Sequence, residues 1–241
     1  MGNFELISFA SADELAPRAA GLWLDEIESA NRAGKTHCVA LSGGRIAQKF
    51  FVATVARAKA RAVSFECAHF FWADERCVPP TNPESNFKLA NELLFAPLKI
   101  LTNQIHRIRG EDPPQVAVKL AKEELSLFAH SNKKGQPALD LIFLGMGEDG
   151  HVASLFPEAS AEILNCTAPF LAIENSPKPP PGRISLSFAA IAAAKQVWAL
   201  VSGAGKEAAL HESLALNGKT PLARVVQSRF RTKIFSDFRL D

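Results

Sequence analysis

Short runs of apolar residues alternate along the chain with longer segments in which apolar residues recur at every third or fourth position. The runs have the length of β-strands, and the segments have the period of an α-helix. Strands are expected at residues 4–9, 37–41, 68–72, 105–108, 139–144, 170–173, 197–201 and 233–235. Helices are expected at about residues 11–32, 46–55, 85–94, 113–129 and 206–216.

The alternation of strands and helices predicts the fold class. Strands that are separated by helices form a mostly parallel sheet, and the connecting helices cover its faces. We therefore expect an α/β protein with three layers, namely a mostly parallel Rossmann-like sheet with helices on both faces. A length of 241 residues suits a single domain over residues 1–241.

Charge and composition narrow the possible partners. The 27 basic and 25 acidic residues are spread along the chain, so no long-range field would attract nucleic acid or a membrane surface. The first residues lack the basic start and apolar stretch of a signal peptide, and no run of about 18 apolar residues follows. We expect a cytoplasmic protein that binds neither nucleic acid nor membrane, and by default a monomer.

The four cysteines lie far apart, and no histidine near them has the spacing of a zinc ligand. They are expected to be free thiols, and no metal site is predicted. The cysteines are Cys38, Cys67, Cys77 and Cys166.

Candidate chemistry lies in the loops that follow the strands, because ligands of open α/β sheets bind beyond the carboxyl ends of the strands. Four such loops carry unusual polar residues, at 42–45, 74–76, 145–151 and 202–206. In two of them, glycines precede a predicted helix, at Gly43 and Gly44 and again before Lys206. Backbone N–H groups at such a turn suit a phosphate, although glycine also serves ordinary tight turns.

The loop at 145–151 fits neither a P-loop nor, beyond its glycines, a dinucleotide fingerprint. Its notable feature is the pair Asp149 and His151, placed after a strand where a helix is expected to begin. A histidine titrates near neutral pH and can give and take protons, so the two residues suit acid and base catalysis. The alternative is a polar histidine that caps a helix.

The charged triplet at 74–76 is either a solvated cluster or part of a site. Arginine makes bidentate contacts with phosphate oxygens, so Arg76 is a natural second phosphate ligand beside Lys206. The other histidines have no comparable setting and are expected to be structural or surface residues. They are His37, His69, His106, His130 and His211.

Together these segments resemble the 6-phosphogluconolactonase family, which belongs to a larger group that includes glucosamine-6-phosphate deaminase. The resemblance covers nearly the whole chain. Its most specific parts are LGMGEDGHVASLFP at 144–157, WADERCVP at 72–79, the pair at 85–86, KPPPGRISLS at 178–187 and the loop at 202–206.

The resemblance implies hydrolysis of 6-phosphoglucono-δ-lactone to 6-phosphogluconate in the oxidative pentose phosphate pathway, without a cofactor. It implies that His151 activates water and then protonates the departing ring oxygen, with Asp149 orienting it or binding sugar hydroxyls. Asp74 and Asn86 would hold other hydroxyls. The phosphate would be received by Gly43, Gly44, Arg76, Arg183 and Lys206.

The chain departs from the family pattern at one point. The family usually continues Ser-Gly-Gly-Ser-Thr-Pro, whereas here Arg45, Ile46 and Ala47 follow the two glycines. Arg45 either replaces the lost hydroxyl contacts with a charge-assisted one, points to solvent, or marks an altered substrate preference or a weaker affinity for phosphate.

Two other functions would suit a chain of this fold class. A glucosamine-6-phosphate deaminase of this family places a glutamate five residues after the matching histidine, where this chain has Phe156, which cannot transfer a proton. A non-catalytic sugar-phosphate sensor attached to a transcription regulator would carry a helix-turn-helix segment, and no basic module is found at either end.

Overall fold

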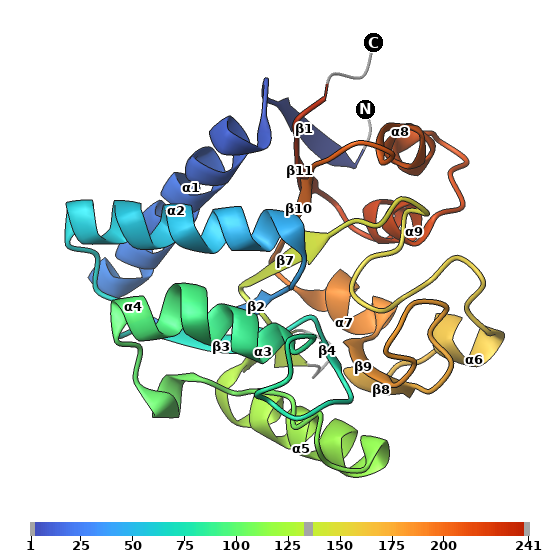
Figure 1. Cartoon of the computed structure of the whole chain (residues 1–241), viewed down its shortest axis with the longest axis horizontal. Coiled ribbons are helices and arrows are strands. Elements are labelled where there is room, and N and C mark those ends of the chain that lie inside the picture. The colour runs from blue at the N-terminus through green and yellow to red at the C-terminus, as the bar shows by residue number, and fades with distance from the viewer. Residues whose placement is uncertain (1–2, 133–136, 239–241) are drawn as a thin grey trace.

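The computed structural model describes residues 3–132 and 137–238, and its centre is a six-stranded sheet (Figure 1). The strand order is β1-β11-β10-β7-β2-β3, and every neighbouring pair is parallel. The predicted parallel α/β sheet is confirmed. Its strands are β1 (Phe4–Ser8), β2 (His37–Leu41), β3 (Ala68–Trp72), β7 (Leu141–Gly145), β10 (Gln196–Val201) and β11 (Thr232–Ser236).

Helices cover both faces of this sheet. Trp23 of the first helix packs edge-on against Phe70 of β3, with ring centroids 6.3 Å apart. Phe71 points to the opposite face, because side chains alternate along a strand, and there it stacks on His106, which contacts Phe128. The longer helices are α1 (Ala12–Arg32), α2 (Arg45–Arg61), α5 (Pro114–Phe128), α8 (Glu207–Leu214) and α9 (Pro221–Gln227).

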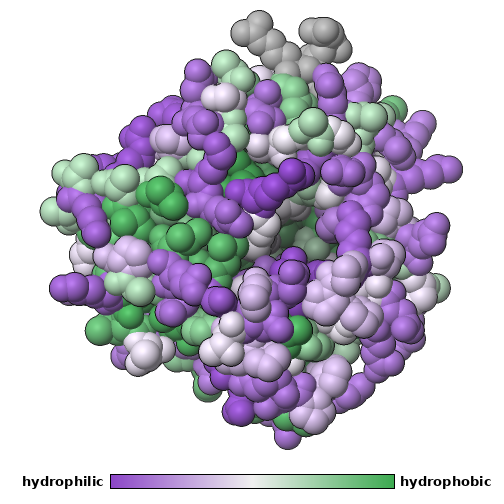
Figure 2. All heavy atoms as spheres, viewed as in Figure 1, coloured by the Kyte–Doolittle hydropathy of each residue, from purple (hydrophilic) through white to green (hydrophobic). Residues whose placement is uncertain are grey.

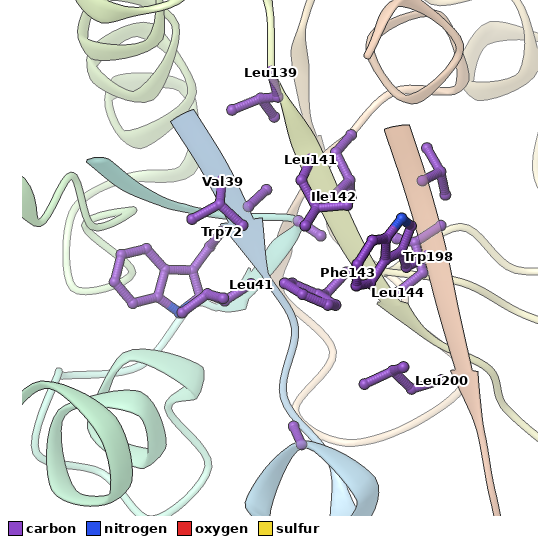
Figure 3. Close-up of a cluster of buried hydrophobic side chains, with 14 of the residues drawn as sticks. Val39, Leu41, Trp72, Leu139, Leu141, Ile142, Phe143, Leu144, Trp198 and Leu200 are labelled. Atoms are coloured by element: carbon purple, nitrogen blue, oxygen red, sulfur yellow. The ribbon is translucent and has the colours of Figure 1, made fainter. Parts of the chain in front are cut away.

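The core lies between the sheet and these helices. Its central part is shown in Figure 3, where side chains of β2, β7 and β10 form one apolar cluster. Leu41, Leu141 and Trp198 in this cluster are at most 1% exposed. Such packing makes the carboxyl ends of the strands fixed points from which loops can present side chains.

A second, antiparallel sheet was not predicted. It consists of β4 (Asp74–Arg76), β9 (Arg183–Leu186) and β8 (Phe170–Ile173), in the order β4-β9-β8. The charged triplet at 74–76 is therefore a strand, and its register places Asp74 opposite Ser185 and Arg76 opposite Arg183. The pairing brings together two predicted site segments that lie over 100 residues apart.

Two predictions on local structure were wrong. Residues 105–108 form only a single bridge from Ile105 to Phe70, and no strand. No helix begins at His151, because the chain keeps turning there, and Gly150 and Ala153 have φ angles of 76° and 50°. The predicted helix at 85–94 is confirmed, and it contains a π-helical turn between two α-helical parts.

The remaining short elements connect the larger ones. They are α3 (Asn86–Ala90), η1 (Asn91–Phe95), α4 (Ala96–Leu98), η2 (Thr102–Gln104), β5 (His130–Ser131), β6 (Pro137–Ala138), α6 (Ala161–Leu164) and α7 (Phe188–Ala193). All four cysteines are free thiols, as predicted. Within the described ranges, no helix has the length and apolar character needed to cross a membrane.

Candidate active site

A cleft of about 130 Å³ opens where β2, β3, β7 and β10 end. Hydrophilic side chains surround a hollow near the middle of the face in Figure 2, beside the start of α2 in Figure 1. Eight of the ten predicted site residues line the cleft, namely Gly43, Gly44, Arg45, Asp74, Arg76, His151, Arg183 and Lys206. The other two, Asp149 and Asn86, contact residues of the lining.

The first glycine loop joins β2 to α2, as predicted. Gly44 caps the helix with a φ of 96°, a conformation that favours glycine. A Cβ on Gly43 would lie less than 2 Å from Oδ1 of Asn86, so only glycine allows this approach. The Ser42 hydroxyl donates to the carbonyl oxygen of Phe143 at 2.8 Å. The loop therefore presents the N-terminus of a 17-residue helix, which attracts anions.

The second glycine loop joins β10 to α8. Ser202 Oγ donates to Oδ2 of Asp237 at 2.6 Å, and the N–H of Gly203 donates to Oδ1 at 3.3 Å. Asp237, which was not predicted, thus anchors the loop. Lys206 ends the loop, and burial and the nearby Arg45 lower the pKa of its ammonium group.

Arg45 is the first residue of α2 and extends along the cleft toward the second loop. A Cβ on Gly203 would lie 4.0 Å from Nη2 of Arg45. Arg45 also lines the cleft and acts electrostatically on Lys206. Its side chain therefore lies between the two glycine loops, and does not simply extend away from the cleft into solvent.

Asp74 lines the cleft and accepts hydrogen bonds from two neighbouring side chains, those of Ser154 and Asn86. Its Oδ2 accepts a hydrogen bond from Ser154 Oγ at 2.7 Å. Nδ2 of Asn86 donates to the carbonyl oxygen of Asp74 at 2.9 Å and to its Oδ1 at 3.3 Å. Asn86 is only 3% exposed and does not line the cleft. It holds Asp74 in position, and its predicted contact with sugar hydroxyls stays a prediction.

Glu75 supports the same region and was not predicted. Its carboxylate is 2% exposed and accepts hydrogen bonds from the N–H groups of Asn86 and Phe87 at 2.8 and 2.7 Å, and from Ser85 Oγ at 3.0 Å. Burial raises the pKa of Glu75, although these N–H groups oppose the rise. Glu75 ties the start of α3 to β4 and so fixes the place of Asn86.

Besides Arg45, two arginines line the cleft, and they differ in how many of their donors are free. Nε and Nη2 of Arg183 donate to the carbonyl oxygens of Pro180 and Pro179, each at 2.9 Å. Only Nη1 faces Asp74, at 3.9 Å from Oδ2. Arg76 donates through Nη1 to the carbonyl oxygen of Glu84, and its buried Nε has no hydrogen-bond partner. Arg183 is thus chiefly a support for the loop before β9.

His151 and Asp149 form the predicted pair. Nδ1 of His151 lies 2.5 Å from Oδ1 of Asp149. Since a carboxylate accepts, we assign the hydrogen to Nδ1, which leaves the lone pair on Nε2. A Cβ on Gly147 would lie 2.0 Å from Nδ1, so glycine is required beneath the pair. Phe156 packs on the imidazole, with ring centroids 4.7 Å apart.

Burial is the main influence on the titration of this pair. It lowers the pKa of His151, Lys178 lowers it further, and Asp149 raises it without restoring the usual value. Burial alone would raise the pKa of Asp149, but the hydrogen bond and charge of His151, with Lys178, lower it overall. At neutral pH the site therefore combines a neutral imidazole with a carboxylate.

Lys178 is a site residue that the sequence did not single out. Its Nζ lies 3.5 Å from Nδ1 of His151 and 3.6 Å from Oδ2 of Asp149. It belongs to the Pro-rich segment that matched the family, but its distance from the histidine along the chain gave no sign of contact.

A larger cleft, of about 1050 Å³, lies on the other side of Phe156 and Ser154. Three carboxylates line it, those of Glu158, Glu162 and Glu174, with no lysine, arginine or histidine. This lining does not suit a phosphate. Across residues 3–132 and 137–238, no group of three His, Cys, Asp or Glu side chains is arranged to hold a metal ion.

Comparison with known proteins agrees with this geometry. The profile described as glucosamine-6-phosphate isomerases/6-phosphogluconolactonase matches residues 10–234. The chain belongs to this family. The 6-phosphogluconolactonase of Mycobacterium tuberculosis is 35% identical over 221 residues, which span 89% of this chain and 87% of that protein.

Solved structures show that a lactonase and a deaminase share the fold of this chain, so the fold alone does not tell the two activities apart. The structure of 6-phosphogluconolactonase from Thermotoga maritima has a TM-score of 0.79 at 26% identity, covering 97% of this chain and 98% of that one. A monomeric glucosamine-6-phosphate deaminase has a TM-score of 0.78 at 16% identity, covering 96% and 97%. Function within the glucosamine-6-phosphate isomerase/6-phosphogluconolactonase family must therefore be argued from side chains.

Proposed function

We propose that the chain hydrolyses 6-phosphoglucono-δ-lactone to 6-phosphogluconate in the oxidative pentose phosphate pathway, as a cytoplasmic enzyme without a cofactor. The observation that carries the proposal is the neutral His151 on Asp149 in a cleft whose other residues include Arg45, Arg76 and Lys206. We also propose that the chain acts as a monomer with a single domain.

In the proposed reaction, Nε2 of His151 takes a proton from a water molecule, and the water oxygen attacks the lactone carbonyl carbon. The tetrahedral intermediate then collapses with cleavage of the bond between this carbon and the ring oxygen. The imidazolium gives its proton to the ring oxygen, and the new carboxyl group ionises in water. Asp149 keeps the imidazole in the required tautomer and stabilises its charged form.

The phosphate would bind at the opposite part of the cleft, across the two glycine loops. The N-terminus of α2 supplies N–H groups and partial positive charge, and Arg45 and Lys206 supply full charges. Binding energy from this remote group would position the lactone carbon against His151. Asp74 is placed to accept hydrogen bonds from sugar hydroxyls.

The deaminase reaction is disfavoured by Phe156. This apolar ring is 7% exposed and covers the imidazole at the position where a deaminase of this family has a glutamate. It can transfer no proton. The relatives from Mycobacterium bovis, Streptomyces coelicolor and Haemophilus influenzae, which are 30–38% identical to this chain, are named 6-phosphogluconolactonases, which supports the lactonase activity.

The decisive experiment compares turnover of 6-phosphogluconolactone with that of the unphosphorylated gluconolactone, each corrected for spontaneous hydrolysis. The proposal requires a higher kcat/KM for the phosphorylated lactone. Equal values would contradict phosphate recognition, and turnover of glucosamine 6-phosphate in the same preparation would favour the rival activity.

Lys206→Ala is expected to raise KM for the phosphorylated lactone by roughly 10-fold or more, with a smaller change in kcat, because a charge-assisted contact remote from the reacting carbon is lost. Arg76→Ala is expected to act in the same direction. Steady-state kinetics measure both, with the exposed Lys59→Ala of α2 as the control. A fall in kcat at unchanged KM would place Lys206 at the reacting end instead.

Arg45→Ser restores a serine at the position where the family usually has one. If Arg45 binds the phosphate, this variant raises KM for the phosphorylated lactone several-fold and leaves the unphosphorylated lactone unaffected. Arg57→Ser removes an exposed arginine further along α2 and is the matched control. Arg45→Ala, which has neither the charge nor a hydroxyl, completes the test, and an unchanged or lower KM in this variant would exclude the contact.

A further inference from the structure

We propose that Lys178 is a positioning residue for the His151–Asp149 pair, because its ammonium group holds Oδ2 of Asp149 and thereby keeps Oδ1 on Nδ1 of His151. The proposal rests on three observations, namely the contacts of the ammonium group, the fixation of the loop that carries it, and its absence from the lining of the substrate cleft.

The contacts place Lys178 on the side of the pair away from the reacting nitrogen. Its Nζ lies 3.6 Å from Oδ2 of Asp149, whose Oδ1 lies 2.5 Å from Nδ1 of His151. Each carboxylate oxygen thus faces a different cationic or donor group. An aspartate held at one oxygen only could rotate about its terminal bond, since that torsion is broad. A second contact at Oδ2 opposes this rotation.

The backbone of Lys178 is fixed by hydrogen bonds on both sides. Its N–H donates to Ser176 Oγ at 3.2 Å, and its carbonyl oxygen accepts from the same hydroxyl at 2.9 Å. The carbonyl also accepts from Nη2 of Arg183 at 3.2 Å, and Nη2 and Nε of Arg183 hold the next two carbonyls. The exposed lysine side chain therefore starts from a rigid turn.

Arg183 links this turn to the cleft. The same guanidinium that holds the carbonyls of residues 178–180 directs Nη1 toward Asp74. Arg183 is 5% exposed and lies in β9, which pairs with β4. The turn that carries Lys178 and the strand that carries Asp74 are thus one assembly, so the lysine has a defined position relative to the cleft.

Lys178 does not line the cleft itself, which distinguishes it from Lys206. It should therefore affect the chemical step with little effect on substrate binding. The charged groups that act on His151 are Asp149 and Asp74, which favour its protonated form, and Lys178, which disfavours it. Removing the lysine charge should make the imidazole easier to protonate.

The test is Lys178→Met, which keeps much of the side-chain length and removes the charge. We expect kcat to fall by roughly 10-fold with KM nearly unchanged, because the imidazole is held less firmly in the reactive orientation. Lys178→Arg should restore much of the activity. Lys195→Met is the matched control, because Lys195 is similarly exposed and is paired with Asp140 at the amino ends of β7 and β10, away from the cleft.

A double variant tests whether Lys178 acts through Asp149. If it does, the loss in Asp149→Asn/Lys178→Met will be close to that of Asp149→Asn alone. Additive losses, or a rise in KM without a fall in kcat, would overturn the proposal and make Lys178 a substrate contact.

The kinetic readouts rest on the proposed lactonase function, so a measurement that needs no substrate is included. The Nδ1–H proton of His151, followed by NMR at a pH where the imidazole is neutral, should exchange with water faster in Lys178→Met, because Asp149 holds it less firmly, and at the wild-type rate in Lys195→Met. If its exchange rate is unchanged in Lys178→Met, the positioning role fails whatever the substrate. If exchange is faster while no lactone is turned over, the proposed function fails and the positioning role stands.

Discussion

His151→Gln is expected to lower kcat for the phosphorylated lactone by about 10²- to 10⁴-fold, because the side chain that takes and returns the proton is lost. KM should change little, since the phosphate-binding loops are intact. The protein should remain folded, because the imidazole is at the cleft surface, with 20% of its side chain exposed. Circular dichroism and thermal unfolding check the fold, and steady-state kinetics check the rate.

The wild-type pH profile gives a second check on the same residue. Burial holds the pKa of His151 below its usual value of about 6.5, so the neutral form that acts as base persists to lower pH. As pH falls through the lowered pKa, the imidazole is protonated and kcat declines. The acid limb should therefore lie below pH 6.5 in the wild type. A limb above that value, or full turnover in His151→Gln, would remove the histidine from the mechanism.

Asp149→Asn should lower kcat by about 10²- to 10⁴-fold with a fold that is nearly unchanged, because an amide in place of the carboxylate can present its NH₂ group to Nδ1. The hydrogen of the imidazole would then move to Nε2, where a lone pair is needed. The loss of the negative charge also removes the group that most favours protonation of His151. Kinetics over a range of pH measure both effects.

Glu158→Gln is a suitable control for this change. Glu158 lies on the other side of Phe156, in the larger cleft, and has no contact with the imidazole among its described interactions. Its substitution should leave kcat and the pH profile as they are. If Asp149→Asn behaved like this control, the carboxylate would be a bystander, and the tautomer of His151 would have to be set in another way.

The parts of the fold that the sequence predicted are those in which one local pattern decides the structure. The buried strand β2 is apolar at almost every position, and the turn at Gly43 and Gly44 is followed by a helical period. Since parallel strands end at a common edge, the loops after them could be expected to meet. On this basis Arg45, His151 and Lys206, which lie in three distant segments, were predicted to belong to one site, and all three line the cleft.

The parts that were missed depend on contacts between distant segments. The triplet at 74–76 is too polar to be recognised as a strand, and it becomes one by pairing with β9. The sequence left open whether Glu75 is a solvated charge, whereas in the structure its carboxylate is buried and accepts hydrogen bonds from two N–H groups of α3. The helix expected at His151 was wrong because Gly150 adopts a positive φ that turns the chain away. A period of apolar residues carries no information about such partners.

The bonds that hold the cleft together also bear on how the protein acquires activity during folding. Ser42 reaches Phe143 across 101 positions of the chain, and Ser154 reaches Asp74 across 80. Contacts between residues so far apart form late, because closing long loops costs chain entropy before the contacts can compensate for it. Recovered turnover in a refolding experiment would therefore report the completed molecule, whereas helix content would report only its earlier, local stages.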